Sequence, residues 1–387
     1  MSAAGHEPMR VLQLGRFWDD QHGGIERHAA LLSRELARRG VEVVNLVAAP
    51  GAQGSDIMCD GYRLIRAPSF GKVAGTAMSP ALVWRALVMH WRKPFDIIHL
   101  HLPDPLSHLV SMLLPRKVKR VLTWHSDIVR QQKLLRFYEP WLRRLAWRAD
   151  AIVAATQSHF DSSTQLPQGL PKSRLHVIQY GLDYAPLAMT PAGEAQAAAL
   201  RARAAGRTMV FALGRHVYYK GFDVLIQAMQ AFDGFLVLGG DGPLRDELQA
   251  QAEQGSVPDR IWFSGRIPEE DLAVYFNACD IFCMPSVERS EAFGLVQLEA
   301  MACGKPVVNT WLNNGVNEVS PNGETGLTVP THDPGALAQA LSSLSQDPEL
   351  RARLGANARI RARSEFSLDD MADRHLALYR EVLATRR

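Results

Sequence analysis

The amino-acid sequence predicts an α/β fold with two Rossmann-like, doubly wound domains that face an interdomain cleft. Short apolar runs with strand character alternate with amphipathic helical segments, which is the pattern of a parallel sheet covered by helices on both faces. The alternation stops in residues 183–207, which are rich in Pro and Ala, and then starts again. The length of 387 residues suits two domains, since one domain commonly has about 100–200 residues.

The first domain is predicted to span residues 1–184. A helix at 23–40 separates its first two strands, as in a strand-helix-strand unit of a parallel sheet. Six strands are predicted, at 9–15, 41–49, 95–101, 119–125, 150–156 and 175–181.

The second domain is predicted to span residues 185–365, followed by one amphipathic helix at 366–387. Its strands are predicted at 208–214, 234–240, 261–265, 281–286, 306–310 and 326–330, with helices at 221–232, 243–254 and 268–280. Ligands of open parallel sheets bind beyond the carboxyl ends of the strands, so the loops that follow the strands are where binding residues are expected.

Composition and charge exclude several classes of protein and show that one half of the chain is basic. Hydrophobic residues make up 47% of the chain and charged residues 21%, which excludes wholesale disorder, a collagen-like repeat and a coiled coil. The net charge is +3, but residues 1–180 carry 24 Lys and Arg against 14 Asp and Glu, whereas the remainder carries 19 against 26. The basic half is therefore the candidate for contact with an anionic surface or a nucleic acid.

Cysteine usage and hydropathy indicate a reduced, cytoplasmic protein. Its four cysteines lack the spacing of a zinc site or a disulfide framework. The N-terminus has no apolar stretch before a cleavage site, and no later run approaches the roughly 20 apolar residues of a membrane span. We expect no metal site, no cofactor and no membrane-spanning segment.

Two loops that follow predicted strands could bind phosphate. In the first, Gly23 and Gly24 open a helix and would let a ligand approach its backbone N–H groups; a plain tight turn is the alternative. In the second, Arg215 and Lys220 lie five positions apart and could converge on a diphosphate. Two solvated surface cations are the alternative there.

A third loop, residues 285–304, contains two glutamates eight positions apart. Glu291 lies at the entrance of a helix and Glu299 about two turns into it, so both can point toward one edge of the cleft. A carboxylate that accepts two adjacent hydroxyls is a natural clamp for ribose or another sugar. The N–H groups around Gly294 and Leu295 suit a phosphate.

In this order along the chain, Gly-Gly-Ile-Glu at 23–26, Gly-Arg-x4-Lys-Gly at 214–221 and Glu-x7-Glu at 291–299 resemble the retaining glycosyltransferases of family 4, also called group 1. The resemblance extends from about residue 9 to 385. It implies the GT-B architecture, in which the first domain binds the acceptor and the second the nucleotide sugar, while the last helix packs back on the first domain.

The resemblance also implies roles for individual residues. Arg215 and Lys220 would neutralise the diphosphate. Glu299 would accept the ribose hydroxyls, and Glu291 would hold hydroxyls of the transferred sugar. Further donor contacts are implied for Gly23, Gly24, Arg266, Ile267, Phe293, Gly294 and Leu295. Segment 313–318, Asn-Asn-Gly-Val-Asn-Glu, departs from the Gly-Gly-x-Pro-Glu type of loop that relatives often have.

On the acceptor side, His125 at the end of a predicted strand matches the active-site histidine of the family. A hydrogen-bonded structural histidine is the alternative. Asp127 is interpreted as the residue that fixes the tautomer of His125 or contacts acceptor hydroxyls. His99 and His101 project to one side of their strand and are interpreted as core or rim histidines.

The sequence predicts a metal-independent reaction. It contains no Asp-x-Asp motif, so fixed cations and helix N-terminal amides are expected to stabilise the departing diphosphate. The resemblance implies retention of anomeric configuration, and front-side attack is favoured over a covalent intermediate on Glu291.

The acceptor is suggested by charge. Residues 129–148 carry Lys133 and five arginines among four aromatic residues, which is typical of a membrane-surface helix. Packing of the aromatic residues into the core is the alternative. A lipid-linked saccharide at the inner face of the cytoplasmic membrane is therefore the expected acceptor.

Several alternatives stay open at this point. The donor is expected to be GDP-mannose or GDP-rhamnose, with UDP sugars as the alternative. A nucleotide-sugar epimerase of the same architecture and a non-catalytic assembly protein are rival functions. Nucleic-acid binding is disfavoured, because no known nucleic-acid-binding module accompanies the basic residues.

Overall fold

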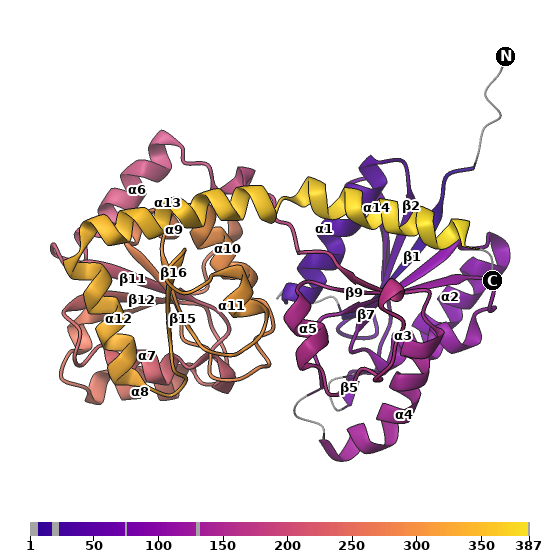
Figure 1. Ribbon diagram of the computed structural model, residues 1–387, viewed down its shortest axis with the longest axis horizontal. Helices are drawn as coiled ribbons and strands as arrows, with labels where there is room; N and C mark the ends of the chain where they lie inside the picture. Colours follow the sequence, from indigo (N-terminus) through magenta and orange to yellow (C-terminus); the bar gives the residue numbers. More distant parts are fainter. Residues whose placement is uncertain (1–6, 18–22, 74–75, 129–131, 386–387) are drawn as a thin grey trace. The chain divides into compact units, whose positions relative to one another are not determined.

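The computed structural model describes residues 7–17, 23–73, 76–128 and 132–385 (Figure 1). The chain forms two compact units, Met1–Gly181 together with Leu368–Arg387, and Leu182–Ser367. From the sequence, we predicted that the chain passes from the first domain to the second after residue 184 and returns after residue 365. Leu182 belongs with the second unit because its N–H donates to the Phe366 carbonyl at 3.2 Å. The interdomain cleft stays a prediction.

The N-terminal unit is built on a sheet with the strand order β10-β9-β8-β7-β1-β2-β4-β3. Among the described strand pairs of this sheet, only β3 and β4 are antiparallel. The strands are β1 (Arg10–Phe17), β2 (Glu42–Ala48), β3 (Ser55–Cys59), β4 (Tyr62–Ala67), β7 (Ile97–Leu102), β8 (Lys119–Trp124), β9 (Ala151–Ala154) and β10 (Leu175–Val177); β5 (Lys72–Val73) and β6 (Thr76–Ala77) form a separate ribbon. The strand order reverses between β1 and β7, which makes that gap the switch point of the sheet.

Helices cover both faces of this sheet because alternate strand residues point to opposite sides. In β1, Val11 packs in one apolar cluster with residues of α1 (Gly24–Arg38) and α14 (Leu368–Ala384). Its neighbour Leu12 packs in the cluster of the other face, with α2 (Pro80–Arg92), α3 (Pro105–Leu113) and α4 (Gln132–Arg148). The short α5 (Gln157–Ser162) follows β9. Figure 1 shows α14, in yellow, running alongside α1.

The C-terminal unit has a fully parallel sheet with the order β13-β12-β11-β14-β15-β16. Its strands are β11 (Thr208–Leu213), β12 (Gly234–Gly239), β13 (Ile261–Gly265), β14 (Ile281–Met284), β15 (Val307–Thr310) and β16 (Gly326–Val329). The strand order reverses between β11 and β14. Ligand-binding loops are therefore expected after these two strands.

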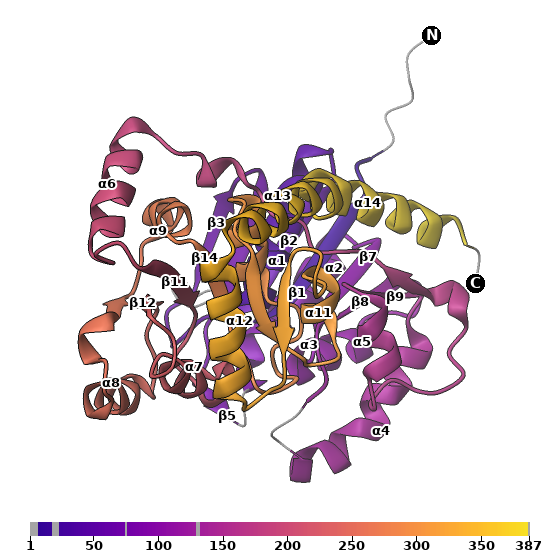
Figure 2. The same cartoon turned by 60° about the vertical axis from the view of Figure 1, so that its left-hand side comes forward.

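Two layers of helices enclose the second sheet (Figure 2). On one face, α7 (Phe222–Ala228), α8 (Arg245–Gln254), α12 (Pro334–Gln346) and α13 (Pro348–Glu365) contribute to the main apolar cluster. On the other face Phe211 of β11 packs edge-on against Phe276, in α9 (Leu272–Ala278), with ring centroids 5.4 Å apart. The remaining helices of this unit are α6 (Pro191–Ala202), α10 (Leu295–Ala302) and α11 (Gly315–Val319), with 3-10 turns at Ala185–Leu187, Tyr218–Lys220, Pro258–Arg260 and Glu269–Asp271. The N-terminal unit has a 3-10 turn at Lys172–Arg174.

The helix predicted at 366–387 is α14, and a buried tyrosine joins it to the N-terminal sheet. The Tyr379 hydroxyl shares a hydrogen bond with Nδ1 of His99 at 2.6 Å and accepts one from Nε2 of Gln13 at 3.3 Å. His99 lies in β7 and Gln13 in β1, so one hydroxyl links the last helix to two strands. Among the helices in the described parts of the chain, none is long and apolar enough to cross a membrane.

Replacing this tyrosine tests the link. Tyr379→Phe leaves Nδ1 of His99 and Nε2 of Gln13 without a buried partner, so we expect the free energy of unfolding to fall by about 1–3 kcal/mol. Urea denaturation measures the change. Tyr275→Phe, at a partly exposed tyrosine of the C-terminal unit, is the control and should shift it by less than about 0.5 kcal/mol. Equal midpoints for the two variants would contradict the hydrogen-bonded link.

Candidate functional site

The two strongest sequence motifs follow the two strands at the switch point of the C-terminal unit. Arg215 and Lys220 lie in the loop after β11, and Glu291 lies in the loop after β14. The two strands are neighbours, with Val210 paired to Ile281. The topology therefore brings the side chains of both loops to the same end of the same pair of strands.

Close backbone contact holds these loops together. The Val287 N–H donates to the Tyr219 carbonyl at 2.8 Å. Gly221 has a φ of +65°, and a Cβ there would lie 2.0 Å from the Pro285 carbonyl oxygen. Only glycine combines that backbone conformation with that close approach. The Gly after Lys220 thus serves the packing of one motif loop on the other.

Lys220 and Glu291 form a buried ion pair between the loops. The Nζ and Oε2 atoms are 2.5 Å apart, and the side chains are only 13% and 12% exposed. Burial is the largest single influence and would lower the pKa of Lys220, but the Glu291 carboxylate and Tyr219 together more than offset it, so the pKa is raised. Arg215, five residues before Lys220 in the same loop, is exposed.

The loop that carries Glu291 is held from two sides. Gly294 has a φ of +71° at the start of α10, and a Cβ there would lie 2.7 Å from Sδ of Met284. Nδ2 of Asn314 donates to the Glu291 carbonyl at 2.6 Å, while its Oδ1 accepts from the Val316 N–H and caps α11. The segment that departs from the family pattern therefore supports the Glu291 loop through the side chain of Asn314.

The structure places the other predicted donor residues as follows. Glu299 is buried in α10 and raises the pKa of Tyr184, secondary to the effect of burial on that tyrosine. Leu295 is the first residue of α10, whereas the Phe293 ring lies in the core, 6.0 Å from that of Phe366. Any Phe293 contact with a donor would therefore come from its backbone.

The segment after β13 lies close to the end of β11. Arg266 is exposed, and Ile267 extends over Gly239, where a Cβ would meet Cδ1 of Ile267 at 2.8 Å. The same position would meet Leu213, the last residue of β11, at 3.0 Å. Ile267 thus reaches the edge of the β11 loop that carries Arg215.

In the N-terminal unit the double glycine lies on the β1 side of the switch point. Gly23 is the N-cap of α1 and Gly24 its first residue; both are exposed. A Cβ on Gly23 would lie 2.6 Å from Oε2 of Glu26, the mobile end of that side chain. The part of this loop at 18–22 lies outside the described residues.

His125 lies at the end of β8 in a chain of buried polar groups. Nε2 of His101 contacts Oε1 of Gln13 at 2.8 Å and must donate its proton. Nδ1 of His101 then accepts from Nε2 of His125 at 3.0 Å, and Nδ1 of His125 accepts from the Tyr180 hydroxyl at 2.5 Å. Both ring nitrogens of His125 are thus occupied, and the residue is only 4% exposed.

The structure corrects the interpretation that Asp127 fixes the tautomer of His125. The Asp127 carboxylate accepts from Nε1 of Trp124 at 3.0 Å, the Ser163 hydroxyl at 2.6 Å and the Thr164 N–H at 2.8 Å. It therefore braces the loop at 163–164. Tyr180 and His101 perform the predicted task, since they contact the His125 ring directly.

Sequence reasoning assigned no role to Tyr180 or His28. His28 lies in α1 two residues after the Gly-Gly-Ile-Glu motif, and among the residues that the structure describes neither of its buried ring nitrogens has a hydrogen-bond partner. Tyr180 gave no signal in the sequence, because it meets His125 only through the fold. The His-x-His pattern of β7 did indicate that His99 and His101 share a face, and both are buried on it.

Within the described residues, one group of side chains has the make-up of a metal site. Nitrogen atoms of His28, His101 and His125 all lie within 4.8 Å of one another, and all three residues are buried. The hydrogen-bond chain already occupies both nitrogens of His101 and of His125. A metal ion would have to break the bond between these two rings, so the arrangement fits a neutral polar network better.

Comparison with known proteins identifies similar sequences over most of the chain. The family described as "Glycosyl transferases group 1" matches residues 199–361, and "Glycosyltransferase Family 4" matches residues 22–185. D-rhamnosyltransferase WbpZ of Pseudomonas aeruginosa is 33% identical over 93% of this chain and 92% of its own length. O-antigen chain mannosyltransferase C of Escherichia coli is 28% identical over 98% of this chain and 100% of its own.

Solved structures show the same fold. Sucrose-phosphate synthase from Thermosynechococcus elongatus superposes with a TM-score of 0.82 at 24% identity, over 97% of this chain and 99% of that chain. A glycosyltransferase from Rickettsia africae superposes with a TM-score of 0.77 at 19% identity, over 98% and 100%.

The buried ion pair can be tested by a double-mutant cycle. Lys220→Met or Glu291→Gln alone leaves the partner charge buried and uncompensated, so each should lower the free energy of unfolding by about 3–5 kcal/mol. The double variant should lose much less than the sum. The exposed pair of Arg207 and Asp233 is the control, with an expected coupling below about 1 kcal/mol. Additive losses at Lys220 and Glu291 would show that they do not interact.

Acid should destabilise the N-terminal unit. Burial lowers the pKa of His28, His99 and His125, and it lowers the pKa of His101 to about 3 and of His375 to about 4. In the unfolded chain histidine titrates near pH 6.5. Between about pH 6.5 and 4 the unfolded state therefore binds more protons, and stability falls as the pH falls.

Each such histidine should lower the free energy of unfolding at pH 5 by about 2 kcal/mol relative to neutral pH. We expect the unit to unfold at pH 5 in urea concentrations that it withstands at pH 7.5, as followed by circular dichroism. His332→Asn, at an exposed histidine, is the control and should leave the pH profile unchanged. A urea midpoint that is constant between pH 7.5 and 5 would contradict the neutral network.

Proposed function

Because the chain belongs to the group 1, family 4 glycosyltransferases and has their GT-B fold, we propose that it transfers a hexose from a nucleoside-diphosphate sugar to a lipid-linked or oligosaccharide acceptor in cell-surface polysaccharide synthesis. GDP-mannose or GDP-rhamnose is the favoured donor. The names of the two relatives, a mannosyltransferase and a D-rhamnosyltransferase, support that choice. UDP sugars are the alternative donors.

One observation carries this proposal. Lys220 and Glu291, from two separate motifs, meet in an ion pair at the switch point of the C-terminal sheet, which is where parallel α/β sheets bind nucleotides, and Arg215 lies in the same loop as Lys220. The exposed Arg215 is free to take a diphosphate as a two-pronged donor, and Lys220 supplies a second positive charge beside it. Glu299, one element further on, would accept the ribose hydroxyls.

We propose that the reaction needs no metal ion. Breaking the bond between the anomeric carbon and the diphosphate leaves negative charge on the departing oxygen. Arg215, Lys220 and the first N–H groups of α10 would stabilise that charge, because they are fixed donors that need no reorganisation during the reaction. The ion pair with Glu291 supports this role, since it keeps Lys220 protonated and in place.

We propose retention of anomeric configuration by front-side attack. The acceptor oxygen would bond to the anomeric carbon on the face that the diphosphate leaves, and the acceptor proton would pass to the departing phosphate oxygen. Glu291 is the carboxylate that a covalent intermediate would need. Its pairing with Lys220 at 2.5 Å makes it a weaker nucleophile and supports the front-side route.

For the acceptor side we propose the N-terminal unit, with contact at the inner face of the cytoplasmic membrane and no nucleic-acid partner. The alternative to membrane contact was that the aromatic residues of α4 pack into the core, and their exposure in the structure can be compared with it. Leu135, Leu142 and Leu145 form the buried face of α4, whereas Phe137 is 79% exposed and Trp141 52% exposed. Exposed aromatic residues among arginines suit a membrane surface. Arg130, from the same predicted helix, lies outside the described residues.

His125 and Asp127 remain the proposed acceptor-side residues. Direct contact between the His125 ring and an acceptor requires Tyr180 or His101 to release a ring nitrogen. Asp127 is closer to solvent than His125, and its brace on the 163–164 loop would shape the acceptor site.

A transfer assay tests the proposed function. Purified protein with a membrane extract as acceptor should release GDP from GDP-mannose or GDP-rhamnose faster than UDP from UDP-glucose. Arg215→Ala should lower kcat about 10²- to 10³-fold, the usual loss when one donor to a developing oxyanion is removed. Arg353→Ala, at an exposed arginine of α13 in the same unit, is the matched control and should keep wild-type turnover.

Other outcomes of the assay separate the parts of the proposal. Turnover abolished by EDTA would contradict metal independence, and a product of inverted configuration, read from its anomeric proton coupling, would contradict retention. Turnover of UDP sugars alone would move the donor to the UDP class. Turnover of donor to an epimer without any acceptor would replace the transferase by an epimerase.

A further inference from the structure

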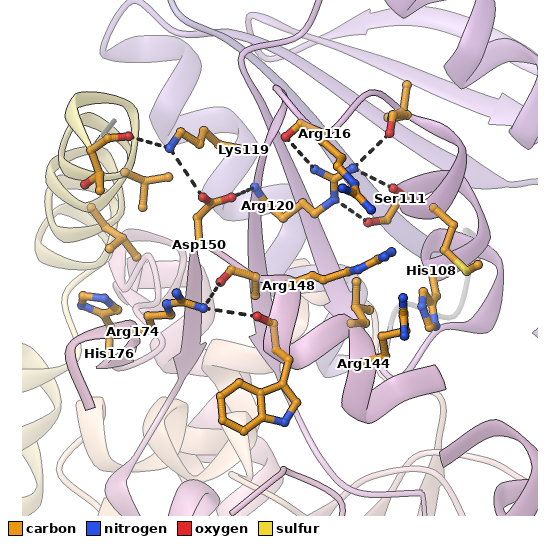
Figure 3. A pocket seen from close by; sticks show the side chains of 18 of the residues that line it. His108, Ser111, Arg116, Lys119, Arg120, Arg144, Arg148, Asp150, Arg174 and His176 are labelled. Atoms are coloured by element: carbon orange, nitrogen blue, oxygen red, sulfur yellow. Dashed lines mark hydrogen bonds and ion pairs between the residues drawn. The ribbon is translucent and has the colours of Figure 1, made fainter. Parts of the chain in front are cut away.

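A pocket lies in the N-terminal unit at the opposite end of the sheet from His125. Its volume is about 930 Å³, and it opens at the amino ends of β8, β9 and β10 (Figure 3). Lys119 starts β8 and His125 follows its end, so the strand separates the pocket from the candidate acceptor site by about 20 Å. The walls come from α3, α4 and the last turns of α14.

The pocket is strongly cationic. Its lining includes six Lys and Arg side chains but only two acidic ones, Asp150 and Glu381. The six are Arg116, Lys119, Arg120, Arg144, Arg148 and Arg174. Such an excess of positive charge in a concave site favours an anionic ligand.

Two of these cations belong to the floor of the pocket. The Arg120 guanidinium donates to the carbonyl oxygens of Val118 and Leu114 at 2.7 and 3.0 Å. Lys119 reaches Asp150 at 3.5 Å and the Thr385 carbonyl at 2.7 Å. These contacts fix the shape of the floor and use the charge of Asp150 there.

Arg144 and Arg148 are different. They are exposed, lie one turn apart on α4, and extend toward the same side of the pocket as the His108 ring (Figure 3). Like charges four residues apart on a helix repel each other, so an anion between them would relieve that repulsion. The charge of Arg148 also adds to burial in lowering the pKa of His108, which keeps that wall neutral. Two guanidinium groups so placed suit the oxygens of a phosphate.

The surroundings of the pocket indicate where the phosphate comes from. Trp141, Trp147 and Met112 line the opening and are about half exposed. Leu113 on α3 and Phe137 on α4 extend the exposed apolar surface beyond it. A small soluble anion would have no use for this rim, whereas acyl chains and the membrane interface would.

We propose that this pocket binds the phosphate of an anionic phospholipid headgroup, with Arg144 and Arg148 as its principal ligands. This proposal rests on the proposed function, and it adds a defined headgroup site to the membrane contact proposed there. It is separate from the candidate transfer site, so both can be occupied at once.

Vesicle binding tests the proposal without any sugar nucleotide, so the result does not depend on transferase activity. Sedimentation with phosphatidylcholine vesicles that contain phosphatidylglycerol should show binding by the wild type, and vesicles of phosphatidylcholine alone should show little. The double variant R144A/R148A should bind the anionic vesicles at least tenfold more weakly than K133A/R136A does. That control removes the same charge from exposed positions of α4 outside the pocket.

A second variant separates a headgroup site from general charge. R144K/R148K keeps both charges but loses the two-pronged geometry, and we expect it to bind about tenfold more weakly than the wild type. Equal losses in R144A/R148A and K133A/R136A, or wild-type binding by R144K/R148K, would overturn the proposal. A third result would also overturn it. If millimolar inorganic phosphate raises the melting temperature of the wild type but not of R144A/R148A, while R144A/R148A still binds vesicles, the site takes free phosphate. If vesicle binding behaves as expected while no glycosyl transfer is found, the proposed function fails and the pocket stands.

Discussion

The buried ion pair between Lys220 and Glu291 is the interaction on which the rest of the candidate site depends. It joins two loops that leave neighbouring strands in opposite directions, and it does so where water is largely excluded. A buried charge without its partner costs several kcal/mol, so each loop has its lowest energy only when the other is in place. The exposed Arg215 lies in the loop of Lys220, and α10 begins at the end of the loop of Glu291. The ion pair therefore helps to fix the positions of both.

The N-terminal unit uses neutral groups in the corresponding place. His125, His101 and Gln13 form a chain in which each hydrogen bond sets the direction of the next, and Tyr379 extends it to His99. Burial lowers the pKa values of the histidines, so the chain stays uncharged at neutral pH. Because α14 supplies Tyr379, the last element of the chain helps to hold the end of β8.

The two ends of the N-terminal sheet therefore have different chemistry. At the carboxyl ends, His125 belongs to a neutral chain of hydrogen bonds, whereas arginines gather in a pocket at the amino ends. The basic character of residues 1–180 is concentrated in part around that pocket, on α4 and the start of β8. Substrate contact and surface contact can thus occupy separate parts of one unit without competing for the same side chains.

The sequence by itself determined the two-domain α/β architecture and the loops that carry Arg215, Lys220 and Glu291, because hydrophobic periodicity and glycine motifs act over short stretches of chain. The GT-B fold followed from the resemblance of these motifs to those of a known family. Only the tertiary structure decided which atoms meet. Asp127 turned to Trp124 and Ser163 instead of His125, and Tyr180 took its place. Partners of this kind depend on which strands become neighbours and how side chains pack between them, and no local pattern encodes that.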